Sequence, residues 1–267
     1  MRPSEVQAWA ADRSAVLAPS TLRMLVSLLR SVYAAAVLDR LVAYSPVVRL
    51  SLPRDERPRV VPLTVEQVQA LAGAMPARNH AMVVTQAGLG LRIGELLALR
   101  VQDVDFPHRT VRVEFQIAPK AQERTAPKAP RSRRVPLPAV VADALALHMQ
   151  QYPPAPDGSI FTTTVGGWYR HDYYGSIIFA KAVRDAGLPT GTTSHALRHH
   201  YASVLLHAGE SVVAVAERLG HENATLVLKT YGHLMPNSEQ RTRAAIDGAW
   251  EAARCAINVP STGSAAP

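Results

Sequence analysis

The sequence predicts a mainly α-helical protein (α+β) with a small antiparallel β-sheet. Apolar residues recur at helical spacing along most of the chain, as in the run Leu22, Leu25, Val26 and Leu29. Residues 110–115 (TVRVEF) instead alternate, which is typical of a strand, and residues 133–137 (RRVPL) predict a second strand. A polar, basic stretch joins these two strands, and the chain contains no internal repeat.

The first 44 residues predict two helices. The first covers about residues 4–12, with Ser4 as its N-cap. The second follows Pro19, takes Ser20 as its N-cap and runs to about Leu41 with an apolar stripe along one side. This stripe needs packing partners, and little sequence precedes it to supply them.

Residues 45–62 differ in composition from the segments on either side. They contain four prolines and four arginines: Pro46, Arg49, Pro53, Arg54, Arg57, Pro58, Arg59 and Pro62. Prolines interrupt helices, and arginines meet solvent or phosphate. The composition therefore predicts an extended basic linker between a small domain (1–44) and a larger one (63–254).

The larger domain begins with a capping box, in which Thr64 and Gln67 satisfy the first backbone N–H groups of a helix that runs to about Met75. Further helices are expected at about residues 79–87, 93–99, 138–151, 171–186, 194–207, 212–219, 223–231 and 238–253. Residues 255–267 are small, polar and proline-containing, and predict a disordered tail.

The composition restricts the classes of function. The formal net charge is +8 and the isoelectric point is about 10.0, which favours a polyanionic partner such as nucleic acid. Cys255 is the only cysteine, which excludes an intramolecular disulfide and a cysteine-rich zinc site. The N-terminal residues lack the apolar core of a signal peptide, and we expect no membrane-spanning stretch, so the sequence predicts a cytoplasmic protein.

Four segments stand out in the sequence because they contain arginines, histidines, a lysine or a tyrosine, and three of the segments also contain glycines or prolines. They are residues 87–97 (AGLGLRIGELL), 126–137 (APKAPRSRRVPL), 194–200 (SHALRHH), and the pair 219–222 (LGHE) and 230–234 (TYGHL). Arg92 follows two glycines near a helix start, and His195 and Arg198 are spaced to share one helical face. Guanidinium groups can bind two phosphate oxygens at once and stay charged.

These segments, taken in order, resemble the tyrosine recombinases, also called the integrase family. The family's order is Arg, Lys, His-x-x-Arg, His or Trp, and Tyr, and the resemblance covers about residues 62–250. It implies a catalytic domain preceded by part of a helical core-binding domain, with no cofactor and no metal. The catalytic residues that it implies are Arg92, Lys128, His195, Arg198, His221 and Tyr231.

The resemblance also implies a role for each residue. Tyr231 would attack a DNA phosphate and form a 3′-phosphotyrosyl ester, while Arg92 and Arg198 would clamp the phosphate oxygens. His195 suits acid–base work because its pKa lies near neutrality. His221 would donate to a phosphate oxygen and help to position the nucleophile.

Two lysines compete for the role of general acid at the departing 5′-oxygen. Lys128 precedes the run 131–137 (RSRRVPL), which resembles the family's strand after the catalytic lysine. Lys120 lies in the same connection, and both lysines could simply bind phosphates.

Three further residues near these motifs have open roles. Glu95, three residues after Arg92, could orient an active-site residue or form an ordinary surface salt bridge. His195 and His199 could chelate a metal at their i, i+4 spacing, but no third ligand sits at metal spacing, so we expect no metal site. His199 and His200 are expected to be packing or capping groups.

The expected function is site-specific recombination or integration of DNA by an enzyme of a mobile element. The expected partners are duplex DNA and further copies of the chain in a tetramer, and accessory DNA-bending proteins are compatible with this function. Two alternatives are a type IB topoisomerase-like enzyme and a non-catalytic or truncated DNA-binding remnant. Only about fifty residues precede the basic linker, so we also expect part of the core-binding domain to be missing.

Overall fold

The computed structural model describes residues 1–54, 60–120, 123–126, 132–221, 223–234 and 239–257. The chain divides into two compact units, Met1–Arg59 and Val60–Pro267. The expected general acid, Lys128, lies outside the described residues.

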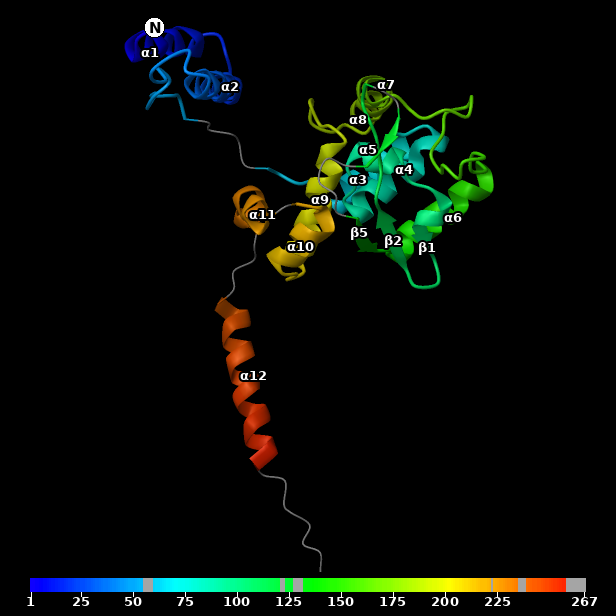
Figure 1. Ribbon diagram of the computed structural model, residues 1–267. Helices are drawn as coiled ribbons and strands as arrows, with labels where there is room; N and C mark the ends of the chain where they lie inside the picture. The colour runs from blue at the N-terminus through cyan, green and yellow to red at the C-terminus, as the bar shows by residue number, and fades with distance from the viewer. Residues whose placement is uncertain (55–59, 121–122, 127–131, 222, 235–238, 258–267) are drawn as a thin grey trace, which may run out of the picture. The chain divides into compact units, whose positions relative to one another are not determined.

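The N-terminal unit contains α1 (Pro3–Ser14) and α2 (Pro19–Leu38), which pack against each other (Figure 1). Its small core includes Val47, which is buried together with residues of both helices. The side-chain amide of Gln7 makes two hydrogen bonds to the backbone of Ser51. Its Nε2 donates to the Ser51 carbonyl at 3.1 Å, and its Oε1 accepts from the Ser51 N–H at 2.9 Å. Part of the segment expected to be linker, residues 45–62, is therefore packed into this unit, because its apolar residues complete the helix pair.

The expected N-caps of both helices, Ser4 and Ser20, are wrong by two residues each. In α1 the cap is Arg2, whose backbone N–H donates to the Glu5 carboxylate at 2.8 Å. In α2 the helix already includes Pro19, whose fixed φ suits the first helical position, and Ala18 precedes it.

By length and composition alone, α2 could cross a membrane, contrary to the expectation that no such stretch exists. Its best window has a mean hydropathy of 1.5. Leu22 and Val26 on this helix are, however, buried within the N-terminal unit, and Arg23 donates to the Pro53 carbonyl at 2.5 Å. The helix is thus one wall of a folded unit.

The C-terminal unit is mainly helical, with two small antiparallel sheets (Figure 1). Its α-helices are α3 (Val65–Ala74), α4 (Ala77–Leu89), α5 (Ile93–Leu97), α6 (Ala139–Gln151), α7 (His171–Tyr173), α8 (Ala180–Asp185), α9 (His195–His207), α10 (Val212–Leu219), α11 (Ala224–Tyr231) and α12 (Glu239–Ile257). The Thr64–Gln67 capping box at the start of α3 is confirmed, with bonds of 3.2 Å and 2.9 Å. A π-helical segment (Tyr174–Phe179) joins α7 to α8, so the helix expected at 171–186 has three parts.

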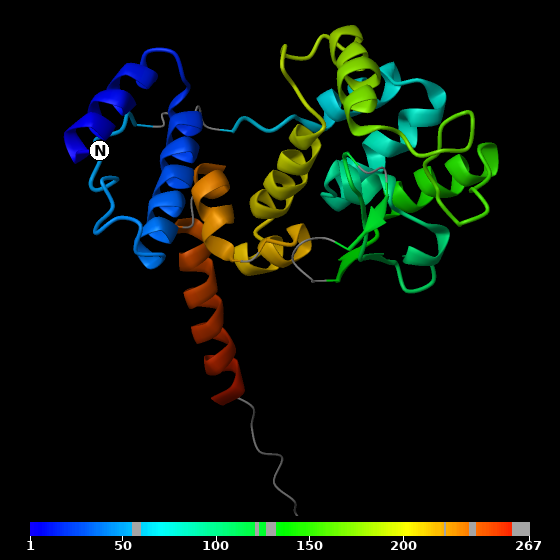
Figure 2. The same cartoon turned by 45° about the horizontal axis from the view of Figure 1, so that its top comes forward.

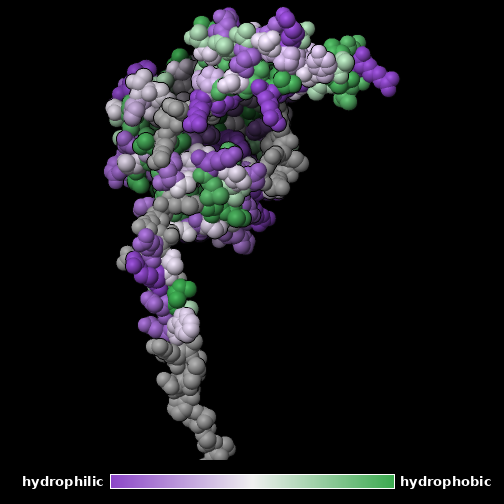
Figure 3. Space-filling view, turned by 90° about the vertical axis from the view of Figure 1, so that its left-hand side faces the viewer, coloured by the Kyte–Doolittle hydropathy of each residue, from purple (hydrophilic) through white to green (hydrophobic). Residues whose placement is uncertain are grey.

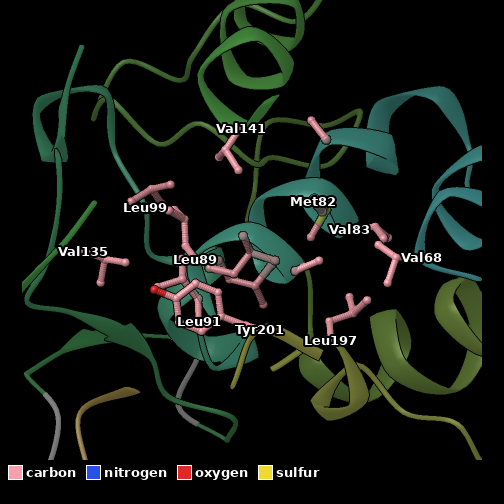
Figure 4. Packing of buried hydrophobic residues seen from close by; sticks show 14 of the residues in the cluster. Val68, Met82, Val83, Leu89, Leu91, Leu99, Val135, Val141, Leu197 and Tyr201 are labelled. Atoms are coloured by element: carbon pink, nitrogen blue, oxygen red, sulfur yellow. The ribbon is translucent and has the colours of Figure 1, made fainter. Parts of the chain in front are cut away.

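The core of this unit forms around α4, which contacts α3, α6 and α9. Buried apolar side chains from these helices and from the sheet interlock, as Figure 4 shows for Met82, Leu89, Val141 and Leu197. Because α4 ends at the centre of this packing, the residues that follow it, 90–97, are held on a rigid base.

The main sheet has the strand order β1 (Val104–Asp105), β2 (Thr110–Val113) and β5 (Arg133–Pro136), all antiparallel. Val111 pairs with Val135, and both side chains are buried. The antiparallel pairing expected from the sequence is confirmed. A second hairpin, β3 (Gln116–Ile117) with β4 (Arg124–Thr125), occupies part of the connection that the sequence shows only as polar and basic.

Helices α9, α10 and α11 are consecutive, and α10 contacts both of the others (Figure 2). The 3₁₀ turn Gly232–Leu234 follows α11. The last helix, α12, presents Ile246 and Trp250 to solvent. Figure 3 shows hydrophilic side chains along one side of this helix and an apolar one on the other. It extends to Ile257, past the point where the disordered tail was expected to begin.

Candidate active site

Two arginines from distant parts of the sequence meet at one short loop. Arg92, immediately before α5, donates from Nη2 to the Gly220 carbonyl at 3.3 Å. Arg198, on α9, donates from Nη2 to the neighbouring Leu219 carbonyl at 2.5 Å and from Nη1 to the Gly90 carbonyl at 2.8 Å. The loop after α10 therefore holds both guanidinium groups at adjacent positions.

The turn that supplies the Gly90 carbonyl requires a glycine. Gly90 ends α4 with φ +64°, and a Cβ there would lie 2.4 Å from the Tyr201 ring. Glycine alone adopts this backbone readily and leaves room for the ring. The close packing places the Gly90 carbonyl against Arg198.

A buried carboxylate organises the other side of the site. Glu95 is 3% exposed, and its two oxygens accept from the Arg92 backbone N–H and Nη1 at 2.8 Å and 2.9 Å. They also accept from Arg133 at 3.0 Å and 2.7 Å. Burial alone would raise the pKa of Glu95, but the hydrogen bonds and charge of Arg133, with those of Arg92, lower it, so the carboxylate stays ionised.

Arg133 is the structural residue that sequence reasoning missed. It lies on β5 on the same face as the buried Val135, so strand alternation alone would have placed this charge inward and indicated a buried partner. Its Nε donates to the Arg218 carbonyl at 2.7 Å. Arg133 thus connects Glu95 to the end of α10.

The loop itself begins with a second left-handed glycine. Gly220 has φ +65°, and a Cβ at this position would lie 2.9 Å from Nη1 of Arg133. The next backbone N–H, of His221, donates to the Ala216 carbonyl at 2.9 Å and closes the helix end. His221 therefore has a fixed position beside the two arginines.

His221 has an unused hydrogen-bonding atom. Its Nδ1 is buried and has no partner among the described residues. Burial, followed by the charges of Arg198 and Arg92, lowers the pKa of His221 to about 4. A neutral imidazole carries one ring N–H, which can be on either nitrogen, so His221 can act as a hydrogen-bond donor beside the two arginines.

His195 and Arg198 lie on the same face of α9, as the sequence predicts. Burial and the charges of Arg198 and Arg92 lower the pKa of His195. Burial and Arg92 also lower the pKa of Arg198, to about 9, which leaves it charged at neutral pH. These mutual effects reflect a cluster of positive groups with one buried carboxylate among them.

Tyr231 is the last residue of α11 and is only 2% exposed. Its hydroxyl lies 2.6 Å from Nδ1 of His199, and the ring of His199 makes edge contacts with both His195 and Tyr231. Burial raises the pKa of Tyr231, while the charge of Arg198 opposes that shift. The phenol is therefore protonated in this arrangement.

Five of the six catalytic residues expected from the sequence thus come together, namely Arg92, His195, Arg198, His221 and Tyr231. Lys120, the rival of Lys128, lies exposed in the connection between β3 and β4. His200 is directed away from this group, since its Nδ1 faces the Leu63 carbonyl at 2.7 Å. The described residues contain no cluster of three or more potential metal ligands.

The arrangement suits an anion with several oxygens. Two guanidinium groups and an imidazole converge on one place, and a tyrosine hydroxyl lies near one of those guanidinium groups. A phosphodiester presents non-bridging oxygens to such donors and a phosphorus atom to a nucleophile.

The similarity to curated relatives extends over most of this chain but over only part of each relative's sequence. The putative integrase of prophage phiRv2 from Mycobacterium tuberculosis is 28% identical over 251 residues, which are 91% of this chain and 66% of that protein. The integrase of Staphylococcus phage L54a is 29% identical over 62% of this chain and 50% of its own. A tyrosine recombinase of Thermosipho africanus is 29% identical over 76% of this chain and 68% of its own. The chain thus spans about half to two thirds of these relatives.

Solved structures share the fold. The Tn1549 transposon integrase in complex with transposon right end DNA has a TM-score of 0.79 at 24% identity, covering 92% of this chain and 85% of that one. The XerH recombinase in a post-cleavage complex has a TM-score of 0.68 at 17% identity, covering 94% and 73%. The model of the phage integrase family matches residues 62–238, which include every residue of the site. The chain belongs to the phage integrase family of tyrosine recombinases.

Proposed function

We propose that this chain cleaves and rejoins duplex DNA at specific sites through a covalent link between Tyr231 and a 3′-phosphate, and so recombines or integrates DNA of a mobile element. The observation that supports this most is the meeting of Arg92 and Arg198 at the Leu219–Gly220 carbonyls, beside His221. The mobile element is suggested by relatives named as prophage and phage integrases.

The reaction is an exchange of one phosphate ester for another. The Tyr231 oxygen attacks phosphorus, the phenol proton passes to His195, and the bond from phosphorus to the 5′-oxygen breaks. The departing oxygen takes a proton from Lys128 and leaves as a 5′-hydroxyl. Because the phosphotyrosyl ester retains the energy of the broken phosphodiester, a 5′-hydroxyl of either DNA can reverse the step without a cofactor.

The remaining residues act on charge and position. Arg92 and Arg198 bind the non-bridging oxygens, whose charge grows in the transition state, and the imidazole of His221 adds a donor. His195 moves a proton to or from the reacting oxygens. Glu95 and Arg133 take no part in the chemistry but hold Arg92 and the loop in place.

The partners that follow are duplex DNA and further copies of the chain. The transposon integrase is in complex with transposon DNA, and XerH is bound to its difH substrate. The chain would assemble as a tetramer on DNA, with or without accessory DNA-bending proteins. In that assembly α12 would contact a neighbouring copy through the exposed apolar side chains of Ile246 and Trp250. Such a reaction belongs in the cytoplasm, where the DNA is.

The test is strand exchange between two DNA duplexes taken from the sequence that flanks the gene. We expect recombinant products with the wild-type chain and none with Tyr231→Phe, which removes a hydroxyl but keeps the ring. Relaxation of a supercoiled plasmid without exchange would instead indicate a topoisomerase. Binding without cleavage would indicate a DNA-binding remnant and would contradict the proposal.

A further inference from the structure

His199 is adjacent in sequence to one of the proposed phosphate-binding arginines but is not among the proposed catalytic residues. It lies one helical turn after His195 on α9 and directly after Arg198. Its Nδ1 lies 2.6 Å from the Tyr231 hydroxyl, and the two rings meet at an interplanar angle of 62°. This contact joins the nucleophile to the helix that supplies Arg198.

The direction of this hydrogen bond follows from the protonation states. Tyr231 is a neutral phenol whose hydroxyl donates, so Nδ1 of His199 accepts and the ring proton sits on Nε2. Burial, then the neighbouring His195 and the charge of Arg198, lower the pKa of His199 to about 4. The imidazole therefore remains a neutral acceptor at neutral pH.

The contact also fixes where the phenol lies. Tyr231 ends α11, and the residues after it form a 3₁₀ turn whose His233 ring contacts the Val60 carbonyl at 3.0 Å. The backbone around the nucleophile is thus anchored after the helix, and within the described part of the chain its hydroxyl is hydrogen-bonded to His199. Since Arg198 and His199 are consecutive residues, one stretch of backbone sets both the phosphate clamp and the hydroxyl that must reach the phosphate.

We propose that His199 is a positioning residue, which accepts the hydrogen bond of Tyr231 and holds its hydroxyl in register with Arg198 before attack. This inference rests on the proposed function of Tyr231 as the nucleophile. In this proposal the phenol proton passes to His195, and His199 only holds the hydroxyl in place before attack. Loss of the contact should allow the phenol to move by an ångström or so and slow attack by about tenfold to a hundredfold.

The substitutions His199→Leu and His199→Asn separate position from proton transfer. Leucine has a similar size and no acceptor, whereas the Asn side-chain oxygen can occupy the place of Nδ1. His207→Leu, at the exposed end of the same helix, is the matched control. The measurements are single-turnover adduct formation on a nicked duplex that carries the cleavage site, DNA affinity, and the pH dependence of the rate.

We expect His199→Leu to form adduct about tenfold to a hundredfold more slowly at unchanged DNA affinity, and His199→Asn to recover most of the rate with the wild-type pH profile. Wild-type rates in His199→Leu would overturn the inference. So would a His199→Asn variant as slow as the leucine variant, since that result would make His199 the base. No adduct with the wild-type chain would instead refute the proposed function.

A second measurement tests the contact independently of cleavage and of the stability of the leucine variant. Nitrogen-15 NMR of the labelled histidines should show His199 as the Nε2–H form with an accepting Nδ1. The Nδ1 signal should move in Tyr231→Phe, which lacks the donor. An unchanged signal would show that the hydrogen bond is absent and would overturn the inference in an active or an inactive protein.

Discussion

At the scale of single residues, the site depends on Gly220, which the sequence motif shows only as part of a turn. Gly220 adopts a left-handed backbone and lets the Arg133 guanidinium pack directly against it. The LGH motif indicates the turn but cannot show the packing, because Arg133 is far away along the chain. The carbonyl of Gly220 accepts a hydrogen bond from Arg92, and the carbonyl of the preceding Leu219 accepts one from Arg198.

Gly220→Ala should therefore impair both stability and DNA cleavage. The left-handed conformation costs a non-glycine residue about 1–2 kcal/mol, and the new Cβ must displace Arg133. Gly187→Ala is the matched control, because Gly187 has φ +66° with open space around its Cβ position. We expect a similar backbone cost in both variants but loss of adduct formation only in Gly220→Ala. Equal cleavage by both would show that the Gly220–Arg133 contact does not support the site.

The choice between Lys128 and Lys120 is also made at this scale. If Lys128 protonates the departing oxygen, Lys128→Ala should cleave ordinary DNA slowly, since the leaving alkoxide is a strong base. A substrate with sulfur at the bridging 5′ position needs no such proton and should restore the rate. Lys120→Ala serves as the comparison and should need no rescue. Rescue of Lys120→Ala alone would assign the acid to Lys120.

At the scale of elements, hydrophobic periodicity predicted the helices well and the sheet in part. The helix at 212–219 lies where its pattern predicts, and the strands expected at 110–115 and 133–137 are found, slightly shorter, at 110–113 and 133–136. The β3–β4 hairpin was missed because each strand has two residues, too few to show alternation. The π-helical part of 171–186 was missed because apolar spacing barely distinguishes it from an α-helix.

The link between α5 and β5 is the element contact that holds the site together. Glu95→Gln would leave the buried Arg133 without a full counter-charge, and breaking a buried ion pair costs about 3–5 kcal/mol. Asp185→Asn removes one partner of the exposed Lys181 pair and should cost about 1 kcal/mol or less. Urea unfolding of both variants checks this. Equal losses would mean that the α5–β5 pair adds no more than a surface pair.

The same contact shows where sequence reasoning about the site reached its limit. The family motif located Arg92 and raised the question of whether Glu95 orients the site or forms a surface bridge. The side chain of Glu95 is 3% exposed and is hydrogen-bonded to Arg92 and Arg133, which favours the orienting role. Neither burial nor a partner 38 positions away can be read from local spacing.

At the scale of the whole molecule, protonation of the site links its electrostatics to stability. Burial and nearby positive charges lower the pKa of His199 and His221 to about 4, whereas histidines in an unfolded chain titrate near pH 6.5. Between these values the unfolded chain binds more protons, so their contribution is fully present above about pH 6.5 and is lost as the pH falls toward 4.

We therefore expect the free energy of unfolding of the chain to fall as the pH is lowered from about 7 to about 4. Replacing both histidines with Asn should make that dependence shallower. Urea titrations at several pH values in this range would measure it. An unchanged slope in the double variant would show that other groups cause the effect.

Family membership rests on residues spread over most of the C-terminal unit, which is why the order of the motifs along the sequence is enough to indicate it. The position of each side chain, in contrast, depends on α4, β5 and the loop after α10 meeting in space. Sequence order thus indicates the family and the candidate residues, and packing determines how the described candidates lie relative to one another.

Whether Tyr231 is the nucleophile can be tested by identifying the residue that becomes linked to DNA. The wild-type chain would be trapped on a nicked duplex, digested with protease, and the peptide that retains nucleotide would be sequenced by mass spectrometry. We expect a peptide that contains Tyr231, with the DNA joined through its 3′-phosphate. A link at another residue, or through a 5′-phosphate, would contradict it.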